Sequence, residues 1–174
     1  MAPFDHRAFA VRAATAIDLA ALPEIERQAH SIFYGMAGLG AVAERPPTTI
    51  DRLRRGPCWL AAQQDGRIVG FIVADQLEGD TLIETLAILP EFSGAGLGRA
   101  LVGAATEWGK EIGMGSVLVA AYRDIPWDAP FYARLGFSEV PHRQWSSELH
   151  RLRREATLLG HDPARRLWMR LSLN

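Results

Sequence analysis

Three glycines at alternate positions are the residues of this chain whose spacing most directly suggests chemistry. Gly94, Gly96 and Gly98 follow an apolar run that ends before Pro90, and an amphipathic stretch begins at Leu97. A glycine-rich turn from a strand into a helix lets backbone N–H groups approach a bulky anion, and the helix dipole favours negative charge at the same point. The segment therefore predicts a pyrophosphate site; the other interpretation is a close contact between helix and strand.

Two familiar nucleotide-binding motifs do not fit these glycines. A Walker P-loop needs Gly-Lys followed by Ser or Thr, but Arg99 and Ala100 follow Gly98, so the metal-coordinating hydroxyl is missing. A dinucleotide fold needs its third glycine one residue further on and an acidic residue at the end of the next strand. Asp124 lies near that position, so a dinucleotide-binding oxidoreductase stays as an alternative.

A strand and a helix must hold the glycine segment in place. We predict the strand at residues 81–89 and a helix after the glycines, because apolar residues there repeat at steps of four, four, three and four and form one helical face. These residues are Leu97, Leu101, Ala105, Trp108 and Ile112. The next strand is predicted at residues 116–122. Asp128 and Pro130 then predict the start of a short helix that ends at Gly136.

The flanking segments complete a pattern of mixed strands and helices. Residues 8–14 predict a first strand, and Thr15 or Asp18 is expected to cap a helix behind it. Asp65-Gly66 suits a tight hairpin turn. The hairpin strands are predicted at residues 59–63 and 67–76.

The segments after residue 30 carry weaker or different signals. Residues 31–47 contain three Gly and two Pro and are expected to form loop and short helical turns. Near the C-terminus, residues 145–159 carry an apolar stripe that predicts a helix, and residues 167–173 alternate as a last strand does. That helix must bury its stripe across the end of the sheet or against a second subunit, so a homodimer is an open expectation.

Three separated blocks, in order, give the chain a resemblance to a known family. They are an opening at residues 11–19, the block at residues 86–101, and Ala129-Pro130-Phe131-Tyr132-Ala133-Arg134-Leu135-Gly136-Phe137. Together these blocks resemble the GCN5-related N-acetyltransferases (GNAT), whose cofactor motif is Gln or Arg, two residues, Gly, any residue, Gly. The spacing of Ser93 to Gly98 is similar to that motif, and the resemblance extends over nearly the whole chain.

The resemblance implies acetyl-coenzyme A (acetyl-CoA) as the acyl donor. By this similarity, the backbone amides of the glycine segment would hold the pyrophosphate, and one stretch of the preceding strand would pair with the pantetheine arm. The implied pyrophosphate residues are Ser93, Gly94, Ala95, Gly96, Leu97, Gly98 and Arg99. The implied pantetheine residues are Leu86, Ala87 and Ile88.

The chain departs from the family pattern at two places. Ser93 replaces the usual Gln or Arg, and Ala95 occupies a position that is often basic, so phosphate binding is expected to rely on the backbone and Arg99. Ile125 stands where many members have an Asn that helps to position the cofactor.

Acetyl transfer from a thioester to an amine needs a neutral amine, a stabilised oxyanion and a proton for the departing thiolate. The resemblance implies that Tyr132 gives the proton; alternatively, Tyr132 is one of two packed aromatic residues on a short helix. Glu84 lies two residues before Leu86, and side chains at i and i+2 of a strand share a face, so we expect Glu84 to act as the base through water. Otherwise Glu84 is an exposed carboxylate. A backbone N–H near Ala87 or Ile88 is the expected oxyanion donor.

Composition narrows the remaining classes. The chain has 174 residues and a formal charge of -1, with no long basic run, so we expect one domain over residues 1–174 and no nucleic-acid partner. No apolar stretch approaches the ~20 residues that span a membrane, and the N-terminus has no basic and apolar leader, so we expect a cytoplasmic protein without a membrane partner. Cys58 is expected to be a buried, inert thiol. The five histidines have no metal-ligand spacing, and we predict no metal.

These observations predict an α+β fold of the GNAT type, with a mostly antiparallel, mixed sheet of six or seven strands, splayed between the fourth and fifth, and helices on both faces. The predicted function is transfer of an acetyl or small acyl group from acetyl-CoA to a primary amine of a small molecule or protein, by direct attack. A non-catalytic acyl-CoA-binding regulatory module is the alternative from another class. His30 is expected to be a half-exposed helix residue or to line the acceptor side.

Overall fold

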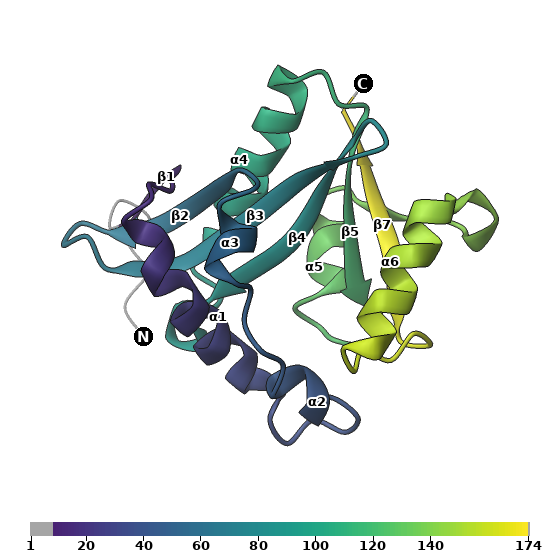
Figure 1. Cartoon of the computed structure of the whole chain (residues 1–174), viewed down its shortest axis with the longest axis horizontal. Helices are drawn as coiled ribbons and strands as arrows, with labels where there is room; N and C mark the ends of the chain where they lie inside the picture. The colour runs from purple at the N-terminus through teal and green to yellow at the C-terminus, as the bar shows by residue number, and fades with distance from the viewer. Residues whose placement is uncertain (1–8, 174) are drawn as a thin grey trace.

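The computed structural model describes residues 9–173, which form one mixed sheet of seven strands with helices on both faces (Figure 1). The strand order is β1-β2-β3-β4-β5-β7-β6. The strands are β1 (Phe9–Ala13), β2 (Cys58–Gln63), β3 (Ile68–Leu77), β4 (Asp80–Ile88), β5 (Ser116–Tyr122), β6 (Ser138–Glu139) and β7 (Arg166–Ser172). The helices are α1 (Leu22–His30), α2 (Gly40–Ala43), α3 (Ile50–Leu53), α4 (Leu97–Glu111), α5 (Ala129–Arg134) and α6 (Ser147–Leu158). The predicted α+β architecture is confirmed.

The first four strands pair antiparallel in chain order, and β2 and β3 form the hairpin that Asp65-Gly66 predicts. Gly66 has a φ of 86°, and its N–H donates to the carbonyl of Gln63 over 2.9 Å, which closes the hairpin between β2 and β3. Cys58 at the start of β2 is buried, and burial raises the pKa of its thiol to about 12, as expected of an inert cysteine. Residue 8, the predicted start of the first strand, and the N-terminal residues before it lie outside the described part of the chain.

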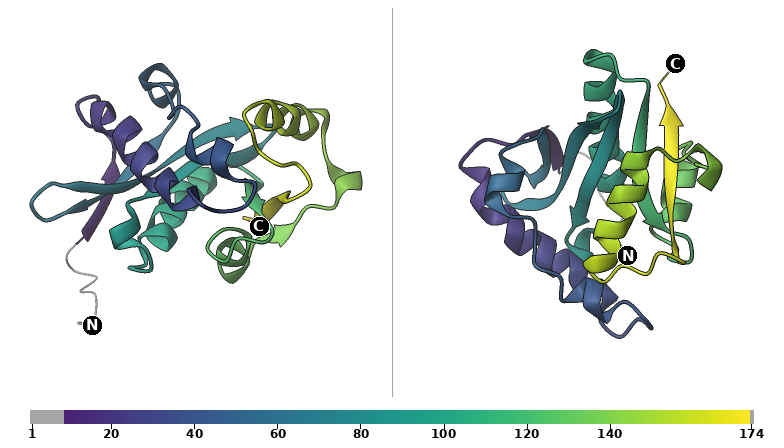
Figure 2. Two further views of the ribbon diagram at one scale, coloured as in Figure 1. Left: turned by 90° about the horizontal axis from the view of Figure 1, so that it is seen from below. Right: turned by 45° about the vertical axis from the view of Figure 1, so that its right-hand side comes forward.

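The helices divide between the two faces of the sheet (Figure 2). On one face, which we call the α6 face, Leu149 of α6 packs with Leu118 of β5 and Trp168 of β7. The alternate residues Val119 and Met169 belong to the main core, which also contains the apolar side of α4. We call this second face the α4 face; it also carries α5, whereas α1, α2 and α3 lie on the α6 face.

The structure corrects three local predictions. The α-helix after β1 begins at Leu22, because Asp18 to Ala21 form a 3₁₀ turn. Asp18 caps no α-helix; its carboxylate accepts from the N–H of Thr15 and pairs with Arg12. The short helix α3 and the two-residue strand β6 were not predicted. Both are too short to show a periodic pattern in the sequence.

The apolar stripe of the C-terminal helix is covered by the sheet. Leu149 and Leu152 of α6, with Trp145 before the helix, pack against the α6 face. Leu159, the last residue of the stripe, stays 54% exposed. The first of the two predicted burial modes therefore accounts for most of the stripe, and the homodimer stays a prediction.

Strands β4 and β5 separate after three residue pairs. They run parallel, and their pairing extends only from Thr81 opposite Val117 to Ile83 opposite Val119. Beyond these pairs, residues 84–88 of β4 and residues 120–122 of β5 have no partner strand on the facing side. We call the space between these two segments the splay. It lies between the fourth and fifth strands, as predicted.

Helix α4 packs very closely on β4, and a glycine makes this possible. A Cβ atom at Gly109 would fall on the hydroxyl oxygen of Thr81, well inside van der Waals contact. Gly103 in the same helix has open space around the equivalent position. The distance between α4 and β4 therefore depends on Gly109, and with it the position of the glycine segment before the helix.

We predict opposite effects of the same substitution at these two glycines. Gly109→Ala should lower the melting temperature, because overpacking typically costs about 1–3 kcal/mol and exceeds the ~1 kcal/mol that Ala gains over Gly in a helix. Gly103→Ala is the matched control and should raise the melting temperature. Calorimetry of both variants checks this; an equal stabilisation by both would contradict the close packing.

Candidate active site

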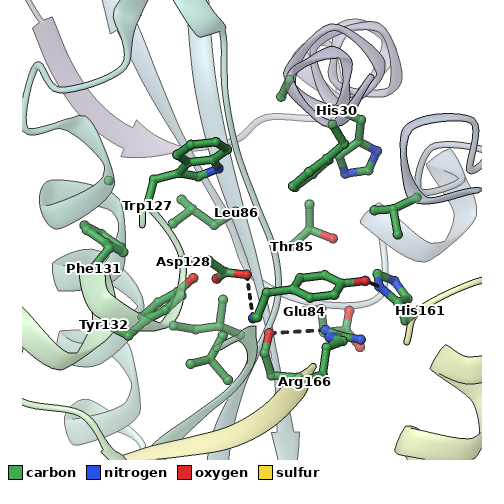
Figure 3. A pocket seen from close by; sticks show the side chains of 18 of the residues that line it. His30, Glu84, Thr85, Leu86, Trp127, Asp128, Phe131, Tyr132, His161 and Arg166 are labelled. Atoms are coloured by element: carbon green, nitrogen blue, oxygen red, sulfur yellow. Dashed lines mark hydrogen bonds between the residues drawn. The ribbon is translucent and has the colours of Figure 1, made fainter. Parts of the chain in front are cut away.

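A cleft of about 950 Å³ runs through the splay (Figure 3). Its walls come from β4, the glycine segment, β5, α5, α6, the C-terminal end of α1 and the first residues of β7. His30 and His161 lie on one side of the cleft, and Phe131 and Tyr132 lie on the other. This volume is within the ~300–1,000 Å³ of ordinary small-molecule sites, so the cleft can hold an extended ligand.

The glycine segment ends in an uncapped helix. Gly94 and Gly96 have φ values of 81° and 80°, which favour glycine. Gly96 is the N-cap residue of α4, and no side chain caps the helix. The first N–H groups of a helix have no partner within it, so those of Leu97, Gly98 and Arg99 are available to an anion. The geometry fits the predicted pyrophosphate site.

Two small residues of the glycine segment also serve the packing of the fold. Gly98 is buried, and a Cβ there would lie 3.0 Å from the ring of Phe131 in α5, so this glycine lets α4 and α5 pack together. The side chain of Ala95 is in the core, and its N–H donates to the carbonyl of Phe92 over 3.4 Å. Ala95 does not line the cleft, whereas Ser93, Gly94 and Gly96 do.

The edge of β4 presents alternate residues to the splay. The N–H of Leu89 donates to the carbonyl of Val69 over 2.9 Å, so by the alternation of an antiparallel ladder Ala87 also bonds to β3. The backbone groups of Leu86 and Ile88 then face the splay. A pantetheine arm would pair with these two residues, and Ile88, not Ala87, is positioned as a backbone oxyanion donor.

Glu84 lies at a β-bulge. The register between β3 and β4 pairs Val73 with Thr85 but Ala74 with Ile83, so Glu84 is an extra residue in β4. The expected sharing of a face between Glu84 and Leu86 is wrong, because the bulge interrupts the alternation. Glu84 pairs with Arg52 of α3, and Thr85 lies beside Thr48 just before that helix. Glu84 still lines the cleft, on the α6 face.

Arg52 holds Glu84 in place. Its guanidinium bonds both Glu84 and Asp75 of β3. Burial raises the pKa of Glu84 above its ordinary value, and the attraction of Arg52 opposes this shift. A carboxylate that titrates above its usual range is better suited to accept a proton near neutral pH.

Tyr132 lies on the opposite side of the cleft from the histidines. Its ring packs edge-on between Phe131 and Phe137, with centroid distances of 5.0 and 5.3 Å, and its hydroxyl points toward Asp128 and the interior (Figure 3). Burial strongly raises the pKa of this phenol, so it keeps its proton at neutral pH. Tyr132 is thus both a packed aromatic residue and a protonated hydroxyl in the cleft.

The side chains of Asp128 and Arg166, which the sequence did not indicate as site residues, bond the free backbone groups of β5. Gly115 and Arg123, which flank β5, each share a backbone hydrogen bond with the residue opposite them on the β7 side. The odd-numbered residues of β5 therefore bond to β7, and the backbone groups of the even-numbered residues face the splay. There the N–H of Tyr122 donates to Asp128 over 2.8 Å, and Arg166 donates to the carbonyl of Ala120 over 3.2 Å. Only the long-range register reveals these roles.

The buried environment of Asp128 also changes the pKa of its carboxyl group. Burial raises its pKa from 3.8 to about 6, although the Tyr122 N–H and Arg166 favour the charged form.

A second titratable group of the cleft, His161, is bonded to a tyrosine. The hydroxyl of Tyr122 lies 2.8 Å from Nδ1 of His161. Burial and the charge of Arg166 lower the pKa of His161 to about 3, so this imidazole is neutral.

A match to a protein-family model identifies the family of this chain. Residues 19–137 match the model described as "Acetyltransferase (GNAT) family". The chain belongs to the GNAT acetyltransferase family. The matched range includes α1, the glycine segment, the splay and Tyr132, and it confirms the resemblance found in the sequence.

Solved structures share the GNAT fold at low sequence identity. A GNAT acetyltransferase from Staphylococcus aureus is 13% identical, covers 96% of this chain and 100% of its own, and gives a TM-score of 0.71. PaiA N-acetyltransferase from Thermoplasma acidophilum, in complex with coenzyme A, is 16% identical over 94% and 98% of the chains, with a TM-score of 0.69. The ribosomal-protein-S18-alanine N-acetyltransferase from Escherichia coli is 16% identical over 95% and 94%, with a TM-score of 0.65.

As a GNAT protein, the chain is an acetyl-CoA-dependent N-acetyltransferase, with acetyl-CoA as donor and an amine as acceptor. Within residues 9–173 no group of three or more His, Cys, Asp or Glu side chains is arranged to hold a metal ion. No helix in that range is long and apolar enough to cross a membrane.

The buried Asp128 of this GNAT protein predicts a dependence of stability on pH. Its pKa is higher in the folded state, so folding favours the protonated form, and stability falls as pH rises from about 4 through about 6. Asp128→Asn stays neutral and still offers an oxygen to Tyr122. The free energy of unfolding of Asp128→Asn minus that of the parent should therefore increase between pH 4 and pH 7. The increase should be at most about 3 kcal/mol, at roughly 1.4 kcal/mol per pKa unit.

Denaturant unfolding at several pH values measures this difference. Asp51→Asn in α3 is the control, because the Asp51 side chain is 82% exposed. A constant difference between Asp128→Asn and the parent at all pH values would contradict the buried, raised-pKa carboxylate.

Proposed function

We propose that the enzyme transfers the acetyl group directly from acetyl-CoA to a primary amine that enters from the α6 face. The observation that carries this proposal is the splay, because the cleft connects the uncapped N-terminus of α4 with the opposite side of the sheet through it. Donor and acceptor can therefore meet without a covalent enzyme intermediate. Direct transfer needs only that both substrates be held together.

For the donor, we propose that the first turn of α4 and the turn before it bind the pyrophosphate through backbone N–H groups. The side-chain contribution comes from Arg99, which lines the cleft. Leu86 and Ile88 pair with the pantetheine arm, and the N–H of Ile88 stabilises the oxyanion. The presence of coenzyme A in the PaiA structure supports a site of this kind in the shared fold.

For the reaction, we propose Glu84 as the base and Tyr132 as the acid. Glu84 takes a proton from the ammonium group, directly or through water, so that the neutral amine can attack the thioester carbon. The C–N bond forms, the C–S bond breaks, and Tyr132 gives its proton to the leaving thiolate. The amine nitrogen loses its second proton as it becomes an amide, and this proton returns through water to the Tyr132 phenolate. The two residues lie on opposite sides of the splay, one toward each substrate, which supports this division of roles.

The donor site is tested with two aspartates at glycines of similar backbone conformation. Gly96→Asp should abolish coenzyme A binding, because it puts a side chain and a negative charge at the pyrophosphate site. Gly66→Asp in the β2–β3 turn is the control, since Gly66 also has a positive φ and open space around it. Calorimetric titration should show binding only to the control; equal affinities would remove the donor assignment.

The reaction is tested by turnover with any amine that an acetylation screen identifies. Tyr132→Phe keeps the ring but removes the proton, and general acids contribute about 10² to 10⁴ in rate, so turnover should fall at least ~100-fold with coenzyme A affinity retained. Glu84→Gln should lower turnover and flatten the acidic limb of its pH profile, where activity rises as Glu84 loses its proton.

Asp75→Asn is the matched control for Glu84→Gln, because it removes the other carboxylate that Arg52 bonds. It should keep the acidic limb and move it to lower pH, because the charge of Asp75 contributes to the raised pKa of Glu84. A profile that Glu84→Gln does not alter would show that Glu84 is structural, and retained turnover in Tyr132→Phe would assign the proton to water or another group.

A further inference from the structure

Arg45, Arg166 and His30 line the cleft and are basic. Each also has one buried nitrogen without a hydrogen-bond partner within residues 9–173, namely Nε of Arg45, Nε of Arg166 and Nδ1 of His30. Protein atoms cover these three nitrogens, so a ligand in the cleft would meet the remaining parts of the side chains. The polar groups of this wall are therefore only partly satisfied by the protein itself.

Arg166 lies on the acceptor side of the sheet. It is opposite Tyr122 and two residues before Trp168, which packs under α6, so by strand alternation its side chain is on the α6 face. The glycine segment and α5 are on the α4 face. The phosphates of the donor therefore lie across the sheet from Arg166 and are not the missing partners.

The charge of Arg166 is not balanced by a direct ion pair. Its one hydrogen bond among the described residues goes to the neutral carbonyl of Ala120, and no carboxylate of residues 9–173 lies within 4.0 Å of it. Asp128 attracts it from further away, but one Asp128 oxygen already accepts from Tyr122. A guanidinium stays charged at all physiological pH values, so burial without a paired anion is costly.

The other basic groups nearby are already neutral or compensated. Arg45 pairs over 3.0 Å with Glu26, a fully buried carboxylate, and His30 lies 3.9 Å from the same side chain. His161 is neutral and accepts or donates at Tyr122. Arg153 of α6 also lines the cleft; it donates to the carbonyl of Pro163 over 3.0 Å and lies over the ring of Trp145. Arg166 lies 5.6 Å from the centre of the Tyr122 ring and is thus a cation of the acceptor side without a carboxylate partner.

We propose that the acceptor is an amine that also carries a carboxylate, as a free amino acid does, and that Arg166 binds this carboxylate. This inference rests on the proposed acetyl transfer through the splay. The terminal N–H groups of the Arg166 guanidinium donate to the carboxylate. The amine then points to the splay, where Glu84 lines the same face. A carboxylate matches the planar donor edge of a guanidinium better than a point charge does.

The experiment compares amines that differ only in the carboxylate. Each of the twenty amino acids is assayed with acetyl-CoA beside its α-carboxamide. For at least one pair, kcat/KM of the acid should exceed that of the amide at least 10-fold. Arg166→Met should raise KM for that acid about 10- to 100-fold, the range for a lost hydrogen bond to a charged group, and change kcat less.

Arg170→Met is the matched control. Arg170 is on the same strand and face and also has a buried, unpartnered Nε, but its charge is paired with Asp80 and it does not line the cleft. Its KM for the acid should equal that of the parent. Unliganded Arg166→Met loses the bond to the carbonyl of Ala120 but no ion pair, so its melting temperature should fall less than that of Arg170→Met, which breaks the pair with Asp80.

The outcomes separate this inference from the transfer itself. If no amine of any class is acetylated, the proposed function fails. If amides, decarboxylated amines or phosphate-bearing amines are acetylated as well as or better than the acids, only the carboxylate assignment is overturned. Should Arg166→Met not fold, calorimetric titration of the parent with N-acetyl amino acids and their amides in the presence of coenzyme A decides, since only the acids are expected to bind.

Discussion

The rest of the structure depends on the separation of β4 and β5 after Ile83 and Val119. Two strand edges then face each other without pairing, and their backbone groups need other partners. On β5 the protein supplies these partners itself, with Asp128 and Arg166. On β4 the groups of Leu86 and Ile88 stay open, so the two edges are not equivalent. The edge left open is the one that leads directly into the glycine segment.

Much of this arrangement could be predicted from local sequence. The alternate glycines, the apolar face of α4 and the Asp65-Gly66 turn each have a short-range physical cause, and the structure agrees with all three. The face of Glu84 could not be predicted, because the bulge that decides it depends on the register with β3. Likewise Gly98 differs from its neighbours only because Phe131, far along the chain, packs on it.

Asp128 and Arg166 escaped the sequence analysis for a related reason. Asp128 has the usual appearance of a residue before a helix, and Arg166 that of an outward charge on an alternating strand. Their importance arises from the parity of the β5–β7 ladder, which directs Ala120 and Tyr122 toward the splay. Parity of pairing is a tertiary property, and a single sequence carries no record of it.

The sheet can finally be regarded as two half-sheets, β1 to β4 and β5 with β7 and β6, that share a short parallel junction. That junction consists of the pairs from Thr81 and Val117 to Ile83 and Val119. Gly109 fixes α4 against the first of these residues. The junction therefore sets the spacing of the two half-sheets at the base of the cleft, which Leu82, Ile83 and Val119 also line. The separation of the groups on either side of the cleft thus depends on how three pairs of residues and one glycine pack together.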